Sequence, residues 1–128
     1  MRRLASIFCF SSLALLAVYA VAPLRDHFRE WRGYQNRFNR LADEKFRQSI
    51  PVRANPVGIR QIWNRELDVV DRCITCHQGI DNKFLRDAPH PFRSHPVTPH
   101  KISEIGCTIC HRGQGAATTV QGAHGRLQ

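Results

Sequence analysis

Large apolar residues are scarce in the part of this 128-residue sequence that follows its N-terminal apolar run. A domain with so few of them is marginal unless disulfides, metals or another bound group support it. The scarcity therefore excludes a large self-sufficient apolar core, and we expect a covalent or coordinated group to stabilise the domain. The large apolar residues available to that core are mainly Val69, Val70, Ile74, Ile80, Phe84, Leu85, Phe92, Val97, Ile102, Ile105 and Ile109.

Acidic residues are also scarce, with 10 Asp and Glu against 19 Lys and Arg, which gives a formal net charge of +9. The basic residues are spread along the chain rather than clustered, so the sequence predicts no nucleic-acid partner. A basic surface of this kind suits anionic lipid headgroups, an acidic partner or the carboxylates of a bound cofactor. Low-complexity tracts are absent, and one short unit is the only repeat.

The N-terminus carries the long apolar run. Arg2 and Arg3 precede an uncharged stretch from Leu4 to Leu24, which is long enough to cross a hydrocarbon layer of about 30 Å as a helix. We predict a transmembrane signal-anchor over residues 1–24, in the inner (cytoplasmic) membrane. The two arginines place the N-terminus in the cytoplasm and the rest of this single-pass chain in the periplasm. The alternative is a signal peptide cleaved after Val18-Tyr19-Ala20.

Residues 25–50 predict an amphipathic stalk helix that continues the membrane helix without a break and ends before Pro51. Its large apolar side chains recur every three to five residues, as on one face of a helix. Because little of the chain is left to cover this stripe, we expect the stalk to pack against partner subunits. The alternative is that the helix folds back on its own domain. The stripe consists of Leu24, Phe28, Trp31, Tyr34, Phe38, Leu41 and Phe46.

Prolines and a glycine mark residues 51–58 as an extended connector, and residues 59–128 form the predicted domain. Its first segment, "IRQIWNRELDVVDR", has apolar residues at Ile59, Ile62, Trp63, Leu67 and Val70. That spacing predicts another short amphipathic helix, leading into the repeated unit. We therefore expect a mainly α fold: a transmembrane helix, a stalk helix, and a small loop-rich domain with short helices.

The repeated unit is Cys-x-x-Cys-His, found at residues 73–77 (the first Cys unit) and 107–111 (the second Cys unit). This pattern is typical of covalent c-type haem attachment. Two cysteines at this spacing reach the two vinyl groups of one haem, and the adjacent histidine lies under the iron. The sequence thus predicts two haem c groups. Their thioethers would form at Cys73, Cys76, Cys107 and Cys110, with His77 and His111 as proximal iron ligands.

Zinc and disulfides are the alternatives for the four cysteines. The gap between Cys76 and Cys107 exceeds the about 15–20 residues of a zinc ribbon. Two disulfides would suit a compartment outside the cytoplasm. Neither alternative explains a histidine directly after both cysteine pairs.

The distal iron ligands must come from histidine if the chain supplies them. Methionine is a common distal ligand in cytochromes c, but the one methionine in the sequence is Met1, at the far end of the membrane helix. His95, His100 and His124 are the predicted distal candidates, because they lie in proline- or glycine-rich loops around the Cys units. We expect His27 to be a surface residue and His90 to belong to a turn.

The runs "DRCITCHQGID", "APHPFRSHP", "IGCTICHRGQGAATT" and "AHG" resemble a family of bacterial membrane-anchored multihaem c-type cytochromes. The resemblance covers most of the chain, although only the Cys units are highly specific. It implies bis-histidine ligation of two haems and electron transfer within a respiratory or photosynthetic membrane complex. The partners it implies are other subunits of that complex, the membrane and a soluble electron carrier.

We therefore expect an electron carrier subunit rather than an enzyme. One alternative is a small haem reductase or peroxidase, which needs an open iron position and acid–base groups beside it. The acidic residues near the Cys units are few, and we interpret each as a turn, cap or surface residue. A second alternative is a structural or assembly subunit whose haems serve folding. The acidic residues in question are Asp71, Asp81, Asp87 and Glu104.

Overall fold

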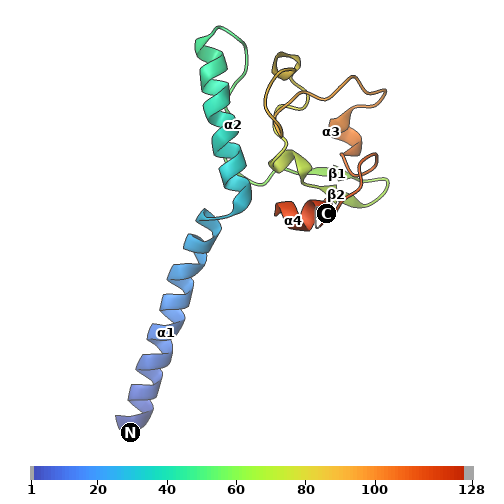
Figure 1. The fold of residues 1–128 in the computed structure, drawn as a ribbon. Helices are drawn as coiled ribbons and strands as arrows, with labels where there is room; N and C mark the ends of the chain where they lie inside the picture. Colours follow the sequence, from blue (N-terminus) through green and yellow to red (C-terminus); the bar gives the residue numbers. More distant parts are fainter. Residues whose placement is uncertain (1, 126–128) are drawn as a thin grey trace.

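The computed structural model describes residues 2–125, so Met1 of the predicted anchor and residues 126–128 of the predicted domain lie outside the described residues. One long helix, α1 (Arg2–His27), extends away from a head formed by the rest of the chain (Figure 1). Helix makes up 48% of the structure, so the expectation of a mainly helical chain with a long apolar N-terminal helix is confirmed. The head contains α2 (Glu30–Arg47), β1 (Ile62–Asn64), β2 (Val69–Asp71), the 3-10 helices η1 (Cys73–Thr75) and η2 (Lys83–Leu85), α3 (Ile102–Ile105) and α4 (Val120–His124).

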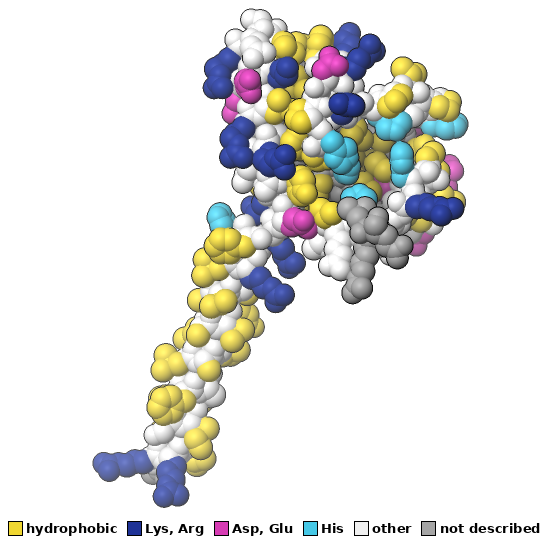
Figure 2. Space-filling view, in the orientation of Figure 1, with side chains coloured by type: hydrophobic (Ala, Val, Ile, Leu, Met, Phe, Trp, Pro, Cys, Tyr) yellow, Lys and Arg dark blue, Asp and Glu magenta, His cyan; other side chains and the backbone are white. Residues whose placement is uncertain are grey.

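Helix α1 is apolar and has no buried residue. Figure 2 shows hydrophobic side chains along its whole length and basic side chains at its free end. It is long and apolar enough to span a membrane, a description that also fits a signal sequence near an N-terminus.

The predicted continuous helix from the membrane span into the stalk is wrong, because the helix breaks between His27 and Glu30. Arg29 adopts an extended conformation, with φ −63° and ψ 136°. Asp26 stabilises the break: its carbonyl accepts from the Arg29 N–H (3.2 Å), and its carboxylate accepts from Arg32 Nη2 (2.9 Å). The chain therefore changes direction where α1 ends, and α2 begins as a separate helix.

Helix α2 belongs to the head, which contradicts the expectation that its apolar stripe is left for partner subunits. Trp31 and Phe38 are 3% and 2% exposed, and the Phe38 ring packs edge-on against Phe92 with ring centroids 5.6 Å apart. The alternative of a helix folded back on its own domain is the arrangement that the structure has. Burial of these aromatic rings within the chain removes a large apolar surface from water. Phe28 and Phe46, beyond either end of the covered stretch, are exposed.

Residues 59–70 do not form the short amphipathic helix that their spacing predicts. β1 and β2 pair as an antiparallel hairpin, with Ile62 opposite Asp71 and Trp63 opposite Val70. The turn between them is closed by Asn64, whose side-chain oxygen accepts from two backbone N–H groups, and by Asp68 at a positive φ of 50°. β-Branched residues favour strands over helices, and the turn residues favour reversal of the chain.

The core lies between α2 and the loops that follow the first Cys unit. Gly79 passes through it at φ +81°, and a Cβ there would lie 2.9 Å from a ring carbon of Phe38. Glycine is therefore required for the chain to leave the first Cys unit and enter the core. The apolar core residues are Phe38, Ala42, Val52, Leu85, Ala88 and Phe92.

Candidate functional site

The two Cys units fold into the same local turn. In the first, the N–H groups of Cys76 and His77 donate to the Cys73 carbonyl (3.1 and 2.9 Å). In the second, those of Cys110 and His111 donate to the Cys107 carbonyl (3.2 and 2.9 Å). Each unit is thus one helical turn, which places its two cysteines one turn apart with the histidine directly after them.

The first Cys unit is held by α2 and the connector. Gln35 is fully buried, and its Nε2 donates to the Thr75 carbonyl (2.9 Å) and to the Gly58 carbonyl (2.7 Å). The Thr75 hydroxyl donates to the Arg60 carbonyl (2.7 Å) and accepts from the Arg60 N–H (3.0 Å). Sequence reasoning missed Gln35, although a polar residue within an apolar helical stripe is a signal of a buried hydrogen-bonding role.

Asp71 joins the two Cys units. Its carboxylate is buried (the residue is 2% exposed) and accepts from the Cys73 N–H (3.0 Å), the Cys107 N–H (2.7 Å) and the Thr108 N–H (2.8 Å). The Thr108 hydroxyl adds a fourth hydrogen bond (3.0 Å). Burial by itself raises the pKa of Asp71, but the backbone hydrogen bonds outweigh it, so the net shift of the pKa is downward.

The first cysteines of the two Cys units lie next to each other. The ligand atoms of Cys73, Cys107 and Asp71 are all within 4.8 Å of one another. A hydrogen bond with Cys107, burial and the Asp71 carboxylate raise the pKa of Cys73, while the same thiol contact lowers the pKa of Cys107. Burial and the negative charge of Glu30 raise the pKa of Cys76 to about 11. Cys110 is exposed, and Cys9 lies in α1.

Each Cys-unit histidine faces another histidine. The ring centroid of His77 lies 6.0 Å from that of His124 and 5.4 Å from that of His90. The His111 and His95 centroids are 5.9 Å apart. Burial and the neighbouring histidines lower the pKa of His77, which favours its neutral form. The structure thus places two of the three predicted distal candidates beside a Cys-unit histidine: His124 beside His77, and His95 beside His111. It also places His90 beside His77, although sequence reasoning assigned His90 to a turn.

Backbone carbonyls orient two of these histidines. Nδ1 of His95 lies 2.8 Å from the Pro96 carbonyl, and Nδ1 of His124 lies 3.2 Å from the Val120 carbonyl. A carbonyl only accepts, so Nδ1 is the donor in both contacts, and Nε2 is the ring nitrogen that the contact leaves available to a metal. A hydrogen bond from one ring nitrogen to a carbonyl is the usual way in which a metal-binding histidine is oriented. Within residues 2–125, the rings of His90 and His100 make no such contact.

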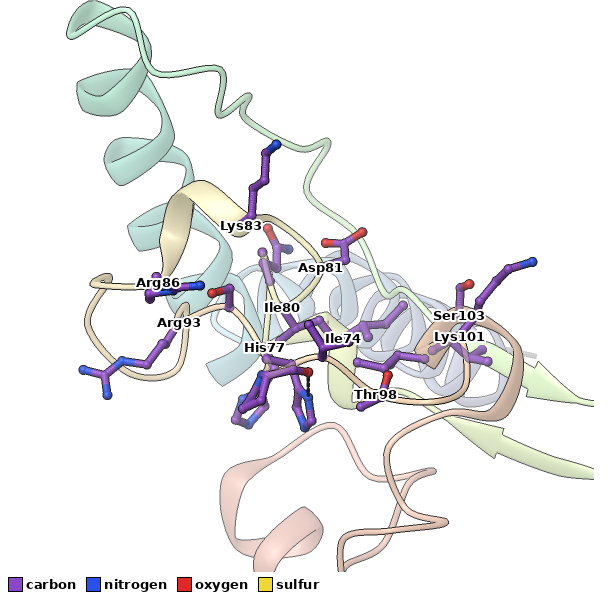
Figure 3. Close-up of a pocket in the computed structure, with 18 of the residues that line it drawn as sticks. Ile74, His77, Ile80, Asp81, Lys83, Arg86, Arg93, Thr98, Lys101 and Ser103 are labelled. Atoms are coloured by element: carbon purple, nitrogen blue, oxygen red, sulfur yellow. Dashed lines mark hydrogen bonds between the residues drawn. The ribbon is translucent and has the colours of Figure 1, made fainter.

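Two cavities adjoin the histidines. The smaller, about 220 Å³, is lined by Cys73, Cys76, His77, His90 and His124, together with Tyr34 and Arg37 of α2. The larger, about 1180 Å³, extends from His77 to His95 and His100. Figure 3 shows Ile74, His77 and Ile80 gathered at its centre, with Lys83, Arg86 and Arg93 at one edge and Lys101 at the opposite edge. Cyan histidines and yellow hydrophobic side chains gather on this face of the head in Figure 2.

These residues fit the covalent haem that the sequence pattern predicts. Two imidazoles on opposite sides of one metal ion, with bonds of about 2 Å, have ring centroids roughly 6 Å apart, and two of the observed pairs have that separation. The apolar walls and basic edges of the larger cavity suit a flat apolar ring that carries carboxylates, whereas Cys73 and Cys76, the cysteines of the first Cys unit, line the smaller cavity beside it. Gln78 Nε2, buried at the wall of this cavity, has no hydrogen-bond partner among the described residues, so it is a donor available to such a carboxylate.

The cluster of Asp71, Cys73 and Cys107 fits a zinc ion poorly. Structural zinc sites use four ligands, and this cluster offers three. The two carboxylate oxygens of Asp71 are also occupied by the four hydrogen bonds that they accept.

Comparisons with protein-family models, with curated proteins and with solved structures found no match to this chain.

Proposed function

We propose that this chain is an electron carrier with two covalently attached haems, one at each Cys unit. The observation that carries the proposal is the pairing of each Cys-unit histidine with a second histidine whose Nε2 is free: His77 with His124, and His111 with His95. Haem bound in this way supplies reversible one-electron oxidation and reduction of iron. Cys73, Cys76, Cys107 and Cys110 would hold the two groups through thioethers.

The surrounding residues support a carrier rather than an enzyme. A reductase or peroxidase needs an open iron position with an acid–base group beside it. Here a histidine faces the proximal histidine of each unit, and the buried carboxylate near both units, Asp71, already accepts four hydrogen bonds. These features favour two closed sites that pass electrons without binding a substrate.

We propose that helix α1 anchors the carrier in a membrane. Helix α1 is suited to a bilayer span, and Arg2 and Arg3 at its free end favour a cytoplasmic N-terminus, with the head on the periplasmic side. The partners we propose are the membrane itself, other subunits of a membrane redox complex, and a soluble carrier that exchanges electrons with the head. Exposed apolar residues such as Phe28 and Phe46 remain free for subunit contacts.

The proposal is tested by measuring covalently bound haem on the full chain. The chain is produced in cells that carry a c-type haem attachment system and is purified in mild detergent. We expect haem-dependent staining at the chain's own mass on a denaturing gel, and a mass increase of two haems. C73A/C76A should keep one haem at the second Cys unit, and C107A/C110A should keep one at the first. A wild-type band without haem would overturn the proposal.

Carbon monoxide separates the carrier from the enzyme. We expect the spectrum of the reduced chain to be unchanged by carbon monoxide, because both irons have histidine on each side. A shifted Soret band would instead indicate an open or labile iron position and would favour the reductase or peroxidase alternative.

A further inference from the structure

Asp71 occupies an unusual position between the two Cys units. Its Oδ1 accepts from the N–H of Cys73, and its Oδ2 accepts from the N–H groups of Cys107 and Thr108 and from the Thr108 hydroxyl. One carboxylate therefore caps the first turn of both units. The first unit begins two residues after Asp71, whereas Cys107 of the second unit is 36 positions further along the chain and reaches Asp71 only through the fold. Charge-assisted hydrogen bonds of this kind are shorter and stronger than neutral ones.

The chain around Asp71 is shaped to allow this double contact. Gly106, at φ +83°, passes so close that a Cβ there would lie 3.0 Å from Asp71 Oδ2. Arg72, the next residue, reaches the segment after the second Cys unit: its N–H donates to the Gly115 carbonyl (2.8 Å) and its Nη1 to the Ala116 carbonyl (2.9 Å). The end of β2 thus holds the second Cys unit through Asp71, and Arg72 holds the segment that follows this unit.

We propose that Asp71 is a positioning residue that holds the first cysteines of the two Cys units side by side, so that the two haems are attached at neighbouring edges as one coupled pair. The proposal rests on the proposed function. It adds that the two attachment units form one composite site, because Cys73, Cys107 and Asp71 place their ligand atoms within 4.8 Å of one another.

Asp71→Asn is the decisive variant. An asparagine side chain offers one acceptor oxygen and one NH₂ group, whereas the carboxylate faces N–H donors on both sides. The NH₂ group must therefore oppose a donor of one unit, and the contact between the units is lost. Asp68→Asn is the matched control: it removes the same charge from the same hairpin, at an exposed residue whose positive φ suits asparagine.

The readout is circular dichroism in the Soret region of the haem-loaded full chain, with intact-mass counting of haems. Two neighbouring haems couple and give a band with two lobes of opposite sign. We expect this signal in the wild type and in D68N, and its loss in D71N, with chains that carry one haem appearing in the mass spectrum. Potentiometric titration should show the two potentials moving toward independent values in D71N.

Thr108→Val is a milder variant that removes one of the four hydrogen bonds and keeps the carboxylate. It should load two haems and show a weaker two-lobed signal, which keeps the proposal testable if D71N folds poorly. A wild-type spectrum without two lobes, or D71N and T108V spectra equal to the wild type, would overturn the role of Asp71 and leave the proposed function standing. Absence of haem from the wild type would be a failure of the proposed function itself.

Discussion

His95 and His124 differ from the other histidines in what holds their rings. Each has its Nδ1 beside a backbone carbonyl, at 2.8 and 3.2 Å, and each faces the histidine of a Cys unit. His90 is closer to His77, at 5.4 Å, but no carbonyl fixes its tautomer within the described part of the chain. His100 lies at the larger cavity without a histidine partner in that part of the chain. The proposed function therefore assigns the distal positions to His95 and His124.

Removal of either distal histidine should change one haem and leave the other. His95→Ala and His124→Ala should each convert about half of the low-spin signal to high-spin, because one iron of two loses its sixth ligand. The measurement is electron paramagnetic resonance with the visible spectrum of the oxidised chain. His100→Ala is the control and should match the wild type. An unchanged H124A spectrum together with a high-spin signal in H90A would move the assignment to His90.

The contribution of Asp71 to stability should depend on pH in acid. Its pKa in the folded chain is lower than the unfolded value of 3.8, so the unfolded state binds more protons between these two values. The stabilisation is complete above pH 3.8 and is lost as the pH falls through the folded pKa. The difference in unfolding free energy between wild type and Asp71→Asn, measured with denaturant, should therefore shrink in acid. A difference that is constant from neutral pH down to about pH 2 would contradict the shift.

At the scale of elements, α2 decides the architecture of the head. It contributes two kinds of contact from one face: the rings of Trp31 and Phe38 supply apolar burial, and Gln35 supplies hydrogen bonds to Gly58 and Thr75. The second kind reaches the backbone of the first Cys unit directly. Helix α2 thus supports the candidate site through the Thr75 carbonyl of the first Cys unit. The hairpin ends at Asp71, which accepts from the Cys73 N–H of the same unit.

Phe38→Ala should destabilise the head by about 3–5 kcal/mol, because it removes a ring that is 2% exposed and leaves a cavity beside Phe92. Phe46→Ala, the same substitution on the same helix at a residue that is 61% exposed, should change stability by less than about 0.5 kcal/mol. Denaturant unfolding of the detergent-solubilised chain measures both. Equal effects of the two substitutions would show that α2 is not packed on the head.

In the whole molecule, α4 lies close to the junction between α1 and the head. The Val120 N–H at the start of α4 donates to the carboxylate of Glu30 (2.8 Å), and Glu30 is the first residue of α2, directly after the break that follows α1. Figure 1 shows α4 at the lower edge of the head, on the side toward which α1 extends.

Truncation should separate the anchor from the head at the break. A fragment that starts at Arg29 keeps α2 and should attach two haems in soluble form. A fragment that starts at Pro51 lacks Phe38 and Ala42, two of the six core residues, as well as Gln35, and should fail to hold haem stably. Haem content per chain, measured after purification without detergent, compares the two. Full loading of the shorter fragment would show that α2 is only a tether.

Features that depend on local chemistry and spacing can be predicted from this sequence alone. The apolar run of α1, the two Cys-x-x-Cys-His units and the scarcity of core residues can be read directly, because each is set by consecutive residues. His95 and His124 were also predicted as candidates from their loops. The packing of α2 on the head could not be predicted, because an apolar stripe indicates that one face of the helix is covered but does not identify the residues that cover it. The hairpin was missed because the apolar spacing of residues 59–70 fits a helix as well as two short strands.

The contacts between residues distant in sequence become visible in the folded chain and not before. His111 faces His95 and His77 faces His124 because α2, the hairpin and the loops bring these segments together. Asp71 has the sequence signature of an ordinary cap, and its contact with Cys107 and Thr108 requires the second Cys unit to pack on the end of β2. A single sequence carries no record of such long-range contacts, because they arise from chain packing rather than from the preferences of neighbouring residues.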